Sequence, residues 1–336
     1  MAKRSVAWAA LIGLAALLAT SGARAADSAA ILLYHRFDDD RLSALNTTTE
    51  QLAAHIADLK SGGYAVLPLA EIVAAMQSGH ALPDKAVAIT IDDASASAYA
   101  KAWPLFRKAG LPVTLFVATD EIDRGGESLT WVQLREMVAQ GAAIGAQGAQ
   151  RQHMARASAE AITADLARAR TRFEKELGGA PTLFAWPWGE ASTQAAILVH
   201  DAGYVAAFGQ HSGAAWAKAD PYFLPRFALT SAYAEIGRFR LAVRSAPLPA
   251  VDISPADPAI TVNPPAFGFT LAEDVPGIEA LSCFASHQGP VKIERLGPRV
   301  EVRMSKPIPP GRGRLNCTVP TLDGRWRWFG WQFVTP

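Results

Sequence analysis

Apolar runs alternate with stretches of helical periodicity from residue 31 to about residue 208. The runs have the length and continuity of strands buried on both faces, and they fall at residues 31–34, 86–91, 113–117, 142–145, 183–186 and 204–208. The clearest helical stretch starts near Ser158 and ends at Gly178, and its apolar stripe is Ile162, Leu166, Ala169, Phe173 and Leu177. This alternation predicts an α/β fold with a parallel sheet, either open or closed as a barrel.

The pattern changes after residue 245. Six prolines between positions 247 and 265 indicate an extended linker. Beyond them helical periodicity disappears, and short apolar runs predict a small β-sandwich. We therefore predict a leader at residues 1–25, an α/β domain at 26–245, a Pro-rich linker at 246–265 and a β-sandwich domain at 266–336.

The first residues have the form of an export signal. Lys3 and Arg4 precede an apolar run at residues 6–19, and Ala23-Arg24-Ala25 supplies a small-residue cleavage motif. A retained N-terminal anchor is the alternative interpretation. No other segment has the apolar length of a membrane span. The sequence thus predicts an exported protein, periplasmic or secreted, without stable membrane insertion.

Composition limits the classes of partner and indicates the state of the two cysteines. The chain of 336 residues is 50% hydrophobic, and its formal net charge of +1 gives no support for a nucleic-acid partner. Its two cysteines, Cys283 and Cys317, both lie in the predicted β-sandwich. In an oxidising compartment such a pair favours a disulfide, and two buried free thiols are the alternative. The sequence leaves the oligomeric state open.

Two adjacent carboxylates, Asp92 and Asp93, directly follow the apolar run at 86–91. Parallel α/β folds place their sites at this end of a strand. Neighbouring residues point in different directions, so one carboxylate can hold a cation while the other acts on water. The alternative is that both side chains cap the helix that follows.

These residues and several others resemble the polysaccharide deacetylase family, carbohydrate esterase family four. Residues 90–94 are similar to its T-F-D-D-G signature. The other matching segments follow in the family's order: Leu-Tyr-His at 33–35, Pro-Val-Thr-Leu-Phe-Val at 112–117, Phe-Ala-Trp-Pro-Trp-Gly at 184–189, Ala-Gly-Tyr-Val-Ala-Ala-Phe at 202–208 and Leu-Pro-Arg at 224–226.

The resemblance implies a distorted parallel (β/α) barrel and a hydrolase that removes acetyl groups from an amino-sugar poly- or oligosaccharide. By position, Asp92 would be the general base and Asp93 a ligand of a divalent metal, zinc or similar, that polarises the acetyl carbonyl. The polysaccharide is the expected partner.

The sequence departs from the family at the H-x-x-x-H motif that supplies the other metal ligands. Gln147 and Arg151 occupy the two histidine positions. A catalytic zinc requires about three protein ligands, and a guanidinium cannot be one of them. Gln147 or His153 would complete a weakened site, or Arg151 would form a bidentate pair with Asp93 in place of the metal, and the protein would then use no cofactor.

Further site candidates come from the ends of other predicted strands. His211 is the candidate general acid, or else a substrate contact or an exposed loop residue. His35 is a candidate substrate contact, or a partner that orients Asp92 or Asp93. The segment at 184–189 adds Trp186, Pro187 and Trp188 as candidate substrate contacts.

The C-terminal segment 325–333 is rich in tryptophan and phenylalanine. Such residues suit a carbohydrate-binding surface or, alternatively, the core of a small sandwich. A bulge at Gly330 would turn Trp331 and Phe333 inward. Two hypotheses follow for the whole chain: an active carbohydrate N-deacetylase, and a degenerate family member that binds polysaccharide without hydrolysing it.

Overall fold

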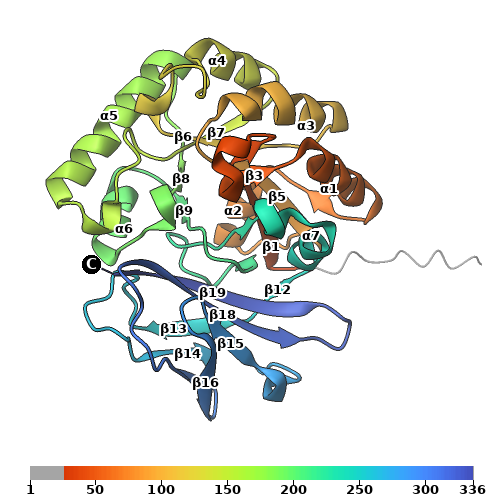
Figure 1. The fold of residues 1–336 in the computed structure, drawn as a ribbon, viewed down its shortest axis with the longest axis vertical. Helices are drawn as coiled ribbons and strands as arrows, with labels where there is room; N and C mark the ends of the chain where they lie inside the picture. The colour runs from red at the N-terminus through yellow and green to blue at the C-terminus, as the bar shows by residue number, and fades with distance from the viewer. Residues whose placement is uncertain (1–25, 336) are drawn as a thin grey trace, which may run out of the picture.

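The computed structural model describes residues 26–335 of the chain. Its first part is a curled, mainly parallel sheet in the order β10-β1-β5-β6-β7-β8-β9, with β4 beside β5 and β11 beside β1 (Figure 1). The strands are β1 (Ser28–Tyr34), β4 (Ala65–Val66), β5 (Ala86–Ile91), β6 (Thr114–Val117), β7 (Ala143–Ala146), β8 (Leu183–Ala185), β9 (Ala206–Phe208), β10 (Ala215–Trp216) and β11 (Phe227–Ala228). The predicted export signal at residues 1–25 lies outside the described residues.

One segment lies between the two ends of this sheet. Phe208 of β9 forms a parallel bridge with Leu224, and three residues later Phe227 pairs in parallel with Leu32 of β1. Residues 224–228 therefore lie between β9 and β1 and run parallel to both strands. The predicted distorted parallel barrel is confirmed.

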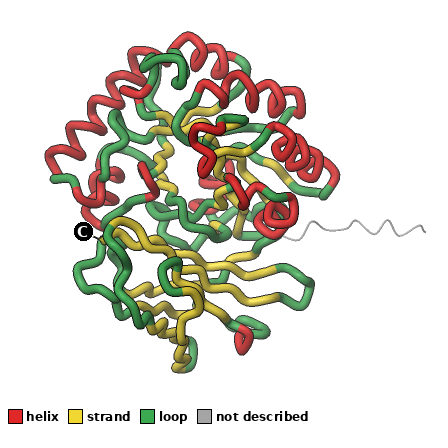
Figure 2. Tube along the Cα trace, in the orientation of Figure 1, coloured by secondary structure: helices red, strands yellow, loops and turns green. Residues whose placement is uncertain are grey.

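Helices surround the outside of this sheet (Figure 2). They begin and end where the sequence supplies caps: Thr48 and Gln51 form a capping box, the Ser158 hydroxyl accepts from the Ala161 N–H, and Gly178 ends its helix at φ 77°. The helices are α1 (Thr49–Ser61), α2 (Leu69–Ser78), α3 (Trp103–Ala109), α4 (Trp131–Ala139), α5 (Ala159–Leu177), α6 (Thr193–Asp201) and α7 (Ile236–Val243). A short π-helix, Ala98–Ala102, leads into α3, and β2 (Arg36–Phe37) pairs with β3 (Asn46–Thr47).

The second part of the chain is an eight-stranded sheet in the order β12-β19-β18-β15-β16-β17-β14-β13. It folds over so that Phe267 of one half packs against Phe329 and Phe333 of the other, as in a small sandwich. Its strands are β12 (Ala246–Pro247), β13 (Ala250–Ser254), β14 (Phe267–Leu271), β15 (Ser282–Ala285), β16 (Gly289–Leu296), β17 (Arg299–Arg303), β18 (Gly311–Pro320) and β19 (Trp326–Thr335). One hydrophobic core cluster includes residues of both sheets.

Two strands lie where the proline content predicts an extended linker at residues 246–265. β12 pairs with β19, and β13 pairs with β14. Both are the outermost strands of their sheet, where proline is tolerated because one side of the strand needs no hydrogen-bond donor. The chain therefore enters the second sheet directly after α7.

The bulge predicted at Gly330 is wrong. β18 and β19 pair in one continuous register from Gly311 opposite Thr335 to Pro320 opposite Trp326. Glycine is required at 330 for another reason: a Cβ there would overlap the carbonyl of Ser212 in the barrel. β19 thus lies against the barrel.

The cysteine pair forms the predicted disulfide. Cys283 of β15 lies directly opposite Cys317 of β18, and the two are bonded. Within residues 26–335, we find no helix with the combined length and apolarity that crossing a membrane would require.

Candidate functional site

Asp92 follows β5 and forms a buried ion pair with Arg226. Arg226 Nη1 donates to Asp92 Oδ1 at 2.7 Å and Nη2 to Oδ2 at 2.8 Å, and neither side chain is exposed. Arg226 Nε also donates to the Gly209 carbonyl at 2.9 Å. A bidentate pair of this kind fixes the plane of the carboxylate. Asp92 is therefore held rigidly by Arg226.

Asp93 forms a second ion pair, with Arg151. Its backbone has φ 73°, and its carboxylate oxygen lies 3.0 Å from Arg151 Nη2. The Asp93 N–H donates to the amide oxygen of Gln147 at 3.2 Å. The sequence predicted a bidentate pair between Arg151 and Asp93. The structure contains this pair with one close contact. The bidentate geometry occurs instead between Arg226 and Asp92.

His35 lies close to both carboxylates. It is 5% exposed, and its Nδ1 is buried without a hydrogen-bond partner in the described part of the chain. Burial lowers the pKa of His35, and the nearby Asp93 and Asp92 oppose this effect in part. A neutral imidazole with an unused nitrogen therefore lies beside the two ion pairs.

His211 has different surroundings. Its ring packs against Phe223 at 4.3 Å between centroids and lies 6.4 Å from Trp331 of β19. Burial lowers its pKa to about 3, and the charges that add to this effect are Arg314 and Arg226. A general acid must carry a proton at the working pH, so these surroundings do not suit His211 to the acid role that the sequence suggested.

The three residues of the Trp-Pro-Trp segment are placed very differently. Trp186 is fully buried and donates to the Tyr222 carbonyl at 2.8 Å, and Pro187 is buried as well. A substrate cannot reach Trp186 in this conformation, which corrects its proposed role as a substrate contact. Trp188 is partly exposed, with φ 62°, a strained value for a bulky residue.

Trp188 is the centre of a cluster that joins both sheets. The Arg151 guanidinium lies 4.6 Å from its ring centroid, and the His153 ring stacks on it at 5.3 Å. Its carbonyl accepts from Arg312 at 2.9 Å and from Gln332 at 3.1 Å, both in the second sheet. The second sheet thus holds the residue that packs on Arg151.

Comparison with known proteins shows what the chain resembles. Residues 79–207 match the family model described as polysaccharide deacetylase. This part of the chain is therefore similar to a polysaccharide deacetylase domain. The relatives of this domain include "Putative polysaccharide deacetylase YxkH" of Bacillus subtilis (strain 168), 24% identical over 196 residues, which are 58% of this chain and 69% of that protein.

Solved structures of other proteins share the fold. IcaB from Ammonifex degensii superposes with a TM-score of 0.58 and 23% identity, covering 65% of this chain and 98% of that one. The Streptococcus pyogenes deacetylase PplD, solved in complex with acetate, superposes with a TM-score of 0.57 and 22% identity, covering 61% and 93%. Each comparison leaves more than a third of this chain without a counterpart.

The residues of this site do not fit the metal that the resemblance to polysaccharide deacetylases implies. Asp93 faces a guanidinium, the Gln147 oxygen already accepts the Asp93 N–H, and His153 Nδ1 is 2.7 Å from Glu190 Oε2. Across residues 26–335, no group of three His, Cys, Asp or Glu side chains could hold a metal ion. The predicted set of Asp93, Gln147 and His153 is therefore not assembled as a ligand shell, because each member is committed to another partner.

Two residues that the sequence left without a role prove central to this site. Arg226 appeared only as the end of the Leu-Pro-Arg motif, yet it satisfies both oxygens of Asp92. Asp165 of α5 is fully buried and accepts from the Ala149 and Gln150 N–H groups at 2.8 and 3.1 Å. It therefore holds the loop between Gln147 and Arg151. The helical periodicity could have identified Asp165, since it is a charged residue next to the apolar stripe of α5.

Proposed function

We propose that this chain is an exported polysaccharide-binding protein that keeps the deacetylase fold without metal-assisted hydrolysis. The observation that carries the proposal is the contact of Arg151 with Asp93. A fixed positive charge 3.0 Å from the carboxylate opposes a divalent cation at that carboxylate. The domain would therefore lack the group that activates water, while it could still bind the polymer.

The exposed rim of the site offers hydrogen-bond donors for a sugar chain. His153, Arg312 and Arg151 surround Trp188, with exposed side-chain fractions of 57%, 39% and 21%. Glu190, which is buried, contacts both His153 and Arg312 and orients them. Guanidinium and imidazole groups held in this way donate to the hydroxyl and amide oxygens that an acetylated sugar presents.

Export is supported by two features. The positive n-region, apolar run and small-residue motif of the first 25 residues have the order of a secretory signal. The disulfide between Cys283 and Cys317 suits an oxidising compartment.

Deacetylation is the second candidate function. It is favoured by the family match and by Asp92, which stands at the position of the family's general base and is held by Arg226. Against it, the Asp92 side chain has no exposed surface, and a general base must reach the water whose proton it takes.

One set of measurements separates the two functions. The purified protein is titrated calorimetrically with acetylated and deacetylated glucosamine oligomers, and acetate release is assayed with and without added zinc or cobalt. We expect binding without acetate release, and we expect His153→Ala with Arg312→Ala to weaken that binding about tenfold, as loss of one or two charged hydrogen bonds would. Trp326→Ala removes an exposed tryptophan elsewhere and serves as the control.

The outcomes are distinct. Acetate release by the unmodified protein that Asp92→Asn abolishes would overturn the proposal and establish deacetylation. Metal binding that appears only after Gln147→His with Arg151→His would support the proposed loss of the metal site. Absence of binding to every oligomer would reject the polysaccharide-binding function.

A further inference from the structure

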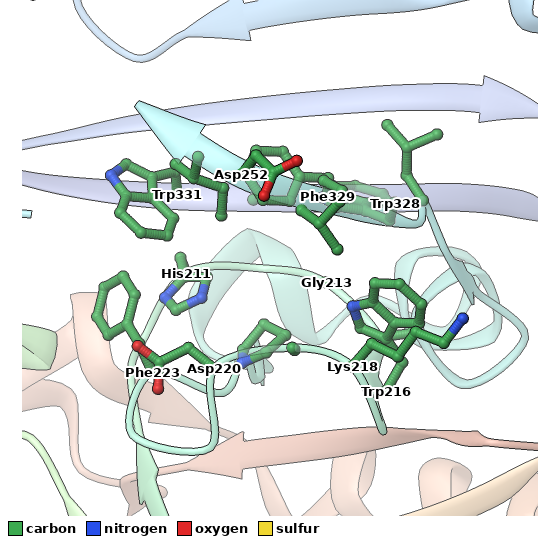
Figure 3. Close-up of a pocket in the computed structure, with 18 of the residues that line it drawn as sticks. His211, Gly213, Trp216, Lys218, Asp220, Phe223, Asp252, Trp328, Phe329 and Trp331 are labelled. Carbon is green, nitrogen blue, oxygen red and sulfur yellow. The ribbon is translucent and has the colours of Figure 1, made fainter. Parts of the chain in front are cut away.

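A cavity of about 330 Å³ lies between the barrel and the second sheet, and none of the residues that line it belongs to the carboxylate pairs. Figure 3 shows its two walls: Trp328, Phe329 and Trp331 of β19 on one side, and the segment of His211, Gly213 and Trp216, which runs into β10, on the other. Sites for small ligands commonly have volumes of about 300–1,000 Å³ and apolar walls with a few polar groups. This cavity fits that description.

Two polar atoms of its wall residues are buried with no hydrogen-bond partner among residues 26–335. They are Trp331 Nε1 and His211 Nδ1, and their residues are 6% and 3% exposed. Almost all buried polar groups in native proteins have a hydrogen-bond partner, so two such atoms on one cavity require an explanation. A bound molecule that both donates and accepts hydrogen bonds would satisfy them.

The charges around the cavity favour a neutral ligand. Lys218, Asp220 and Asp252 lie exposed at its edge, one positive and two negative charges, and His211 is neutral. Asp252 adopts φ 48° at the point where β13 shifts its register against β14, and this irregular backbone places it at the rim. A phosphate or carboxylate ligand would meet a net negative rim, whereas sugar hydroxyls can pair with either sign of charge.

A second hollow of about 360 Å³ continues from the first. The two share Asp220, Phe223, Ala256 and Trp331 in their walls. The rings of Phe223 and Trp331 pack edge to face, with 5.0 Å between their centroids. A chain-like ligand with repeating units could therefore occupy both hollows in succession.

We propose that this seam between the domains is a second carbohydrate site, which binds consecutive sugar residues of the polysaccharide. The sugar ring in the first hollow would lie against the indole of Trp216 and the aromatic wall of β19. Its hydroxyls would pair with Trp331 Nε1 and His211 Nδ1. The proposal rests on the proposed function for its ligand class only, because its residues are separate from Asp92, Asp93 and the Trp188 cluster.

The test blocks the seam from its rim. Ala256 is exposed and lines both hollows, so Ala256→Trp fills the entrance without changing the core. Ala53→Trp, an equal change at an exposed position of α1, is the matched control. Binding of N-acetylglucosamine and glucosamine tetramers is measured by calorimetry, and thermal unfolding confirms that each variant is folded.

We expect Ala256→Trp to weaken oligomer binding at least about tenfold and Ala53→Trp to leave it unchanged. Lys218→Ala with Asp252→Asn should weaken it less, since both side chains are exposed. If His153→Ala with Arg312→Ala weakens binding while Ala256→Trp does not, the seam site is wrong and the proposed function stands. The reverse result supports the seam and rejects the Trp188 cluster as the binding site. Absence of any sugar binding overturns both proposals, and uptake of an apolar dye instead of sugar into the seam overturns the seam site alone.

Discussion

At the scale of single residues, the site shows how much the type and position of a residue in the sequence can predict about its contacts. The apolar run at 86–91 predicted a pair of carboxylates at the carboxyl end of a strand, and in the structure Asp92 and Asp93 directly follow β5. Arg151 at a histidine position predicted an ion pair with Asp93, and the pair is present. Arg226 is 134 residues from Asp92, so their pairing depends on the closure of the barrel, which local patterns do not encode.

The buried pair of Asp92 and Arg226 yields a prediction on stability. Asp92→Asn keeps the shape of the side chain but leaves a buried guanidinium without its counter-charge. We expect the free energy of unfolding to fall by roughly 3–5 kcal/mol. Glu174→Gln, which breaks the exposed pair with Arg170, should change it by less than about 1 kcal/mol. Denaturant unfolding measures both, and equal small effects would contradict the burial of the Asp92 pair.

At the scale of elements, the sequence predicted the long periodic helices and the central strands well. α5 begins after Ser158 and ends at Gly178 as its caps indicate, and β5 has the predicted bounds of 86–91. The misses are short or proline-rich: β10, β11, β12 and β13 are fixed by their neighbours rather than by their own composition. The aromatic residues of β19 also left two roles open, a carbohydrate-binding surface and the core of a small sandwich. Both remained open because a strand presents alternate side chains to two different layers.

The contact of β19 with the barrel leads to a prediction on one glycine. Gly330→Ala places a methyl group on the Ser212 carbonyl, which is backbone and cannot turn aside. We expect a loss of roughly 1–3 kcal/mol in the free energy of unfolding and faster proteolysis between the domains. Gly237→Ala in α7 meets no atom within 4 Å and should stabilise the protein by roughly 0.5–1 kcal/mol. Stabilisation by both changes would show that the barrel and β19 do not touch in solution.

At the scale of the whole molecule, the second sheet does more than follow the barrel. Arg312 and Gln332 hold the carbonyl of Trp188, and Arg156 of the barrel donates to the Thr335 carbonyl at 2.6 Å. Trp331 closes the cavity at the seam. Both candidate binding sites therefore depend on the docking of the two domains, an arrangement that no local pattern in the sequence foreshadowed.

The disulfide provides a test of how strongly the domains are coupled. Cys283 and Cys317 are 34 residues apart, and closing a loop of that length stabilises a fold by about 3–4 kcal/mol in the chain-entropy account. Cys283→Ser with Cys317→Ser should therefore weaken the second sheet and leave the barrel intact. Calorimetry should show one transition for the native protein and an additional, earlier transition for the variant, while a reducing agent should change only the native protein. If the variant instead unfolds in a single transition at a lower temperature, the seam is strong enough to make the two domains one cooperative unit, and loss of the second sheet would then also release Trp188 and Arg151.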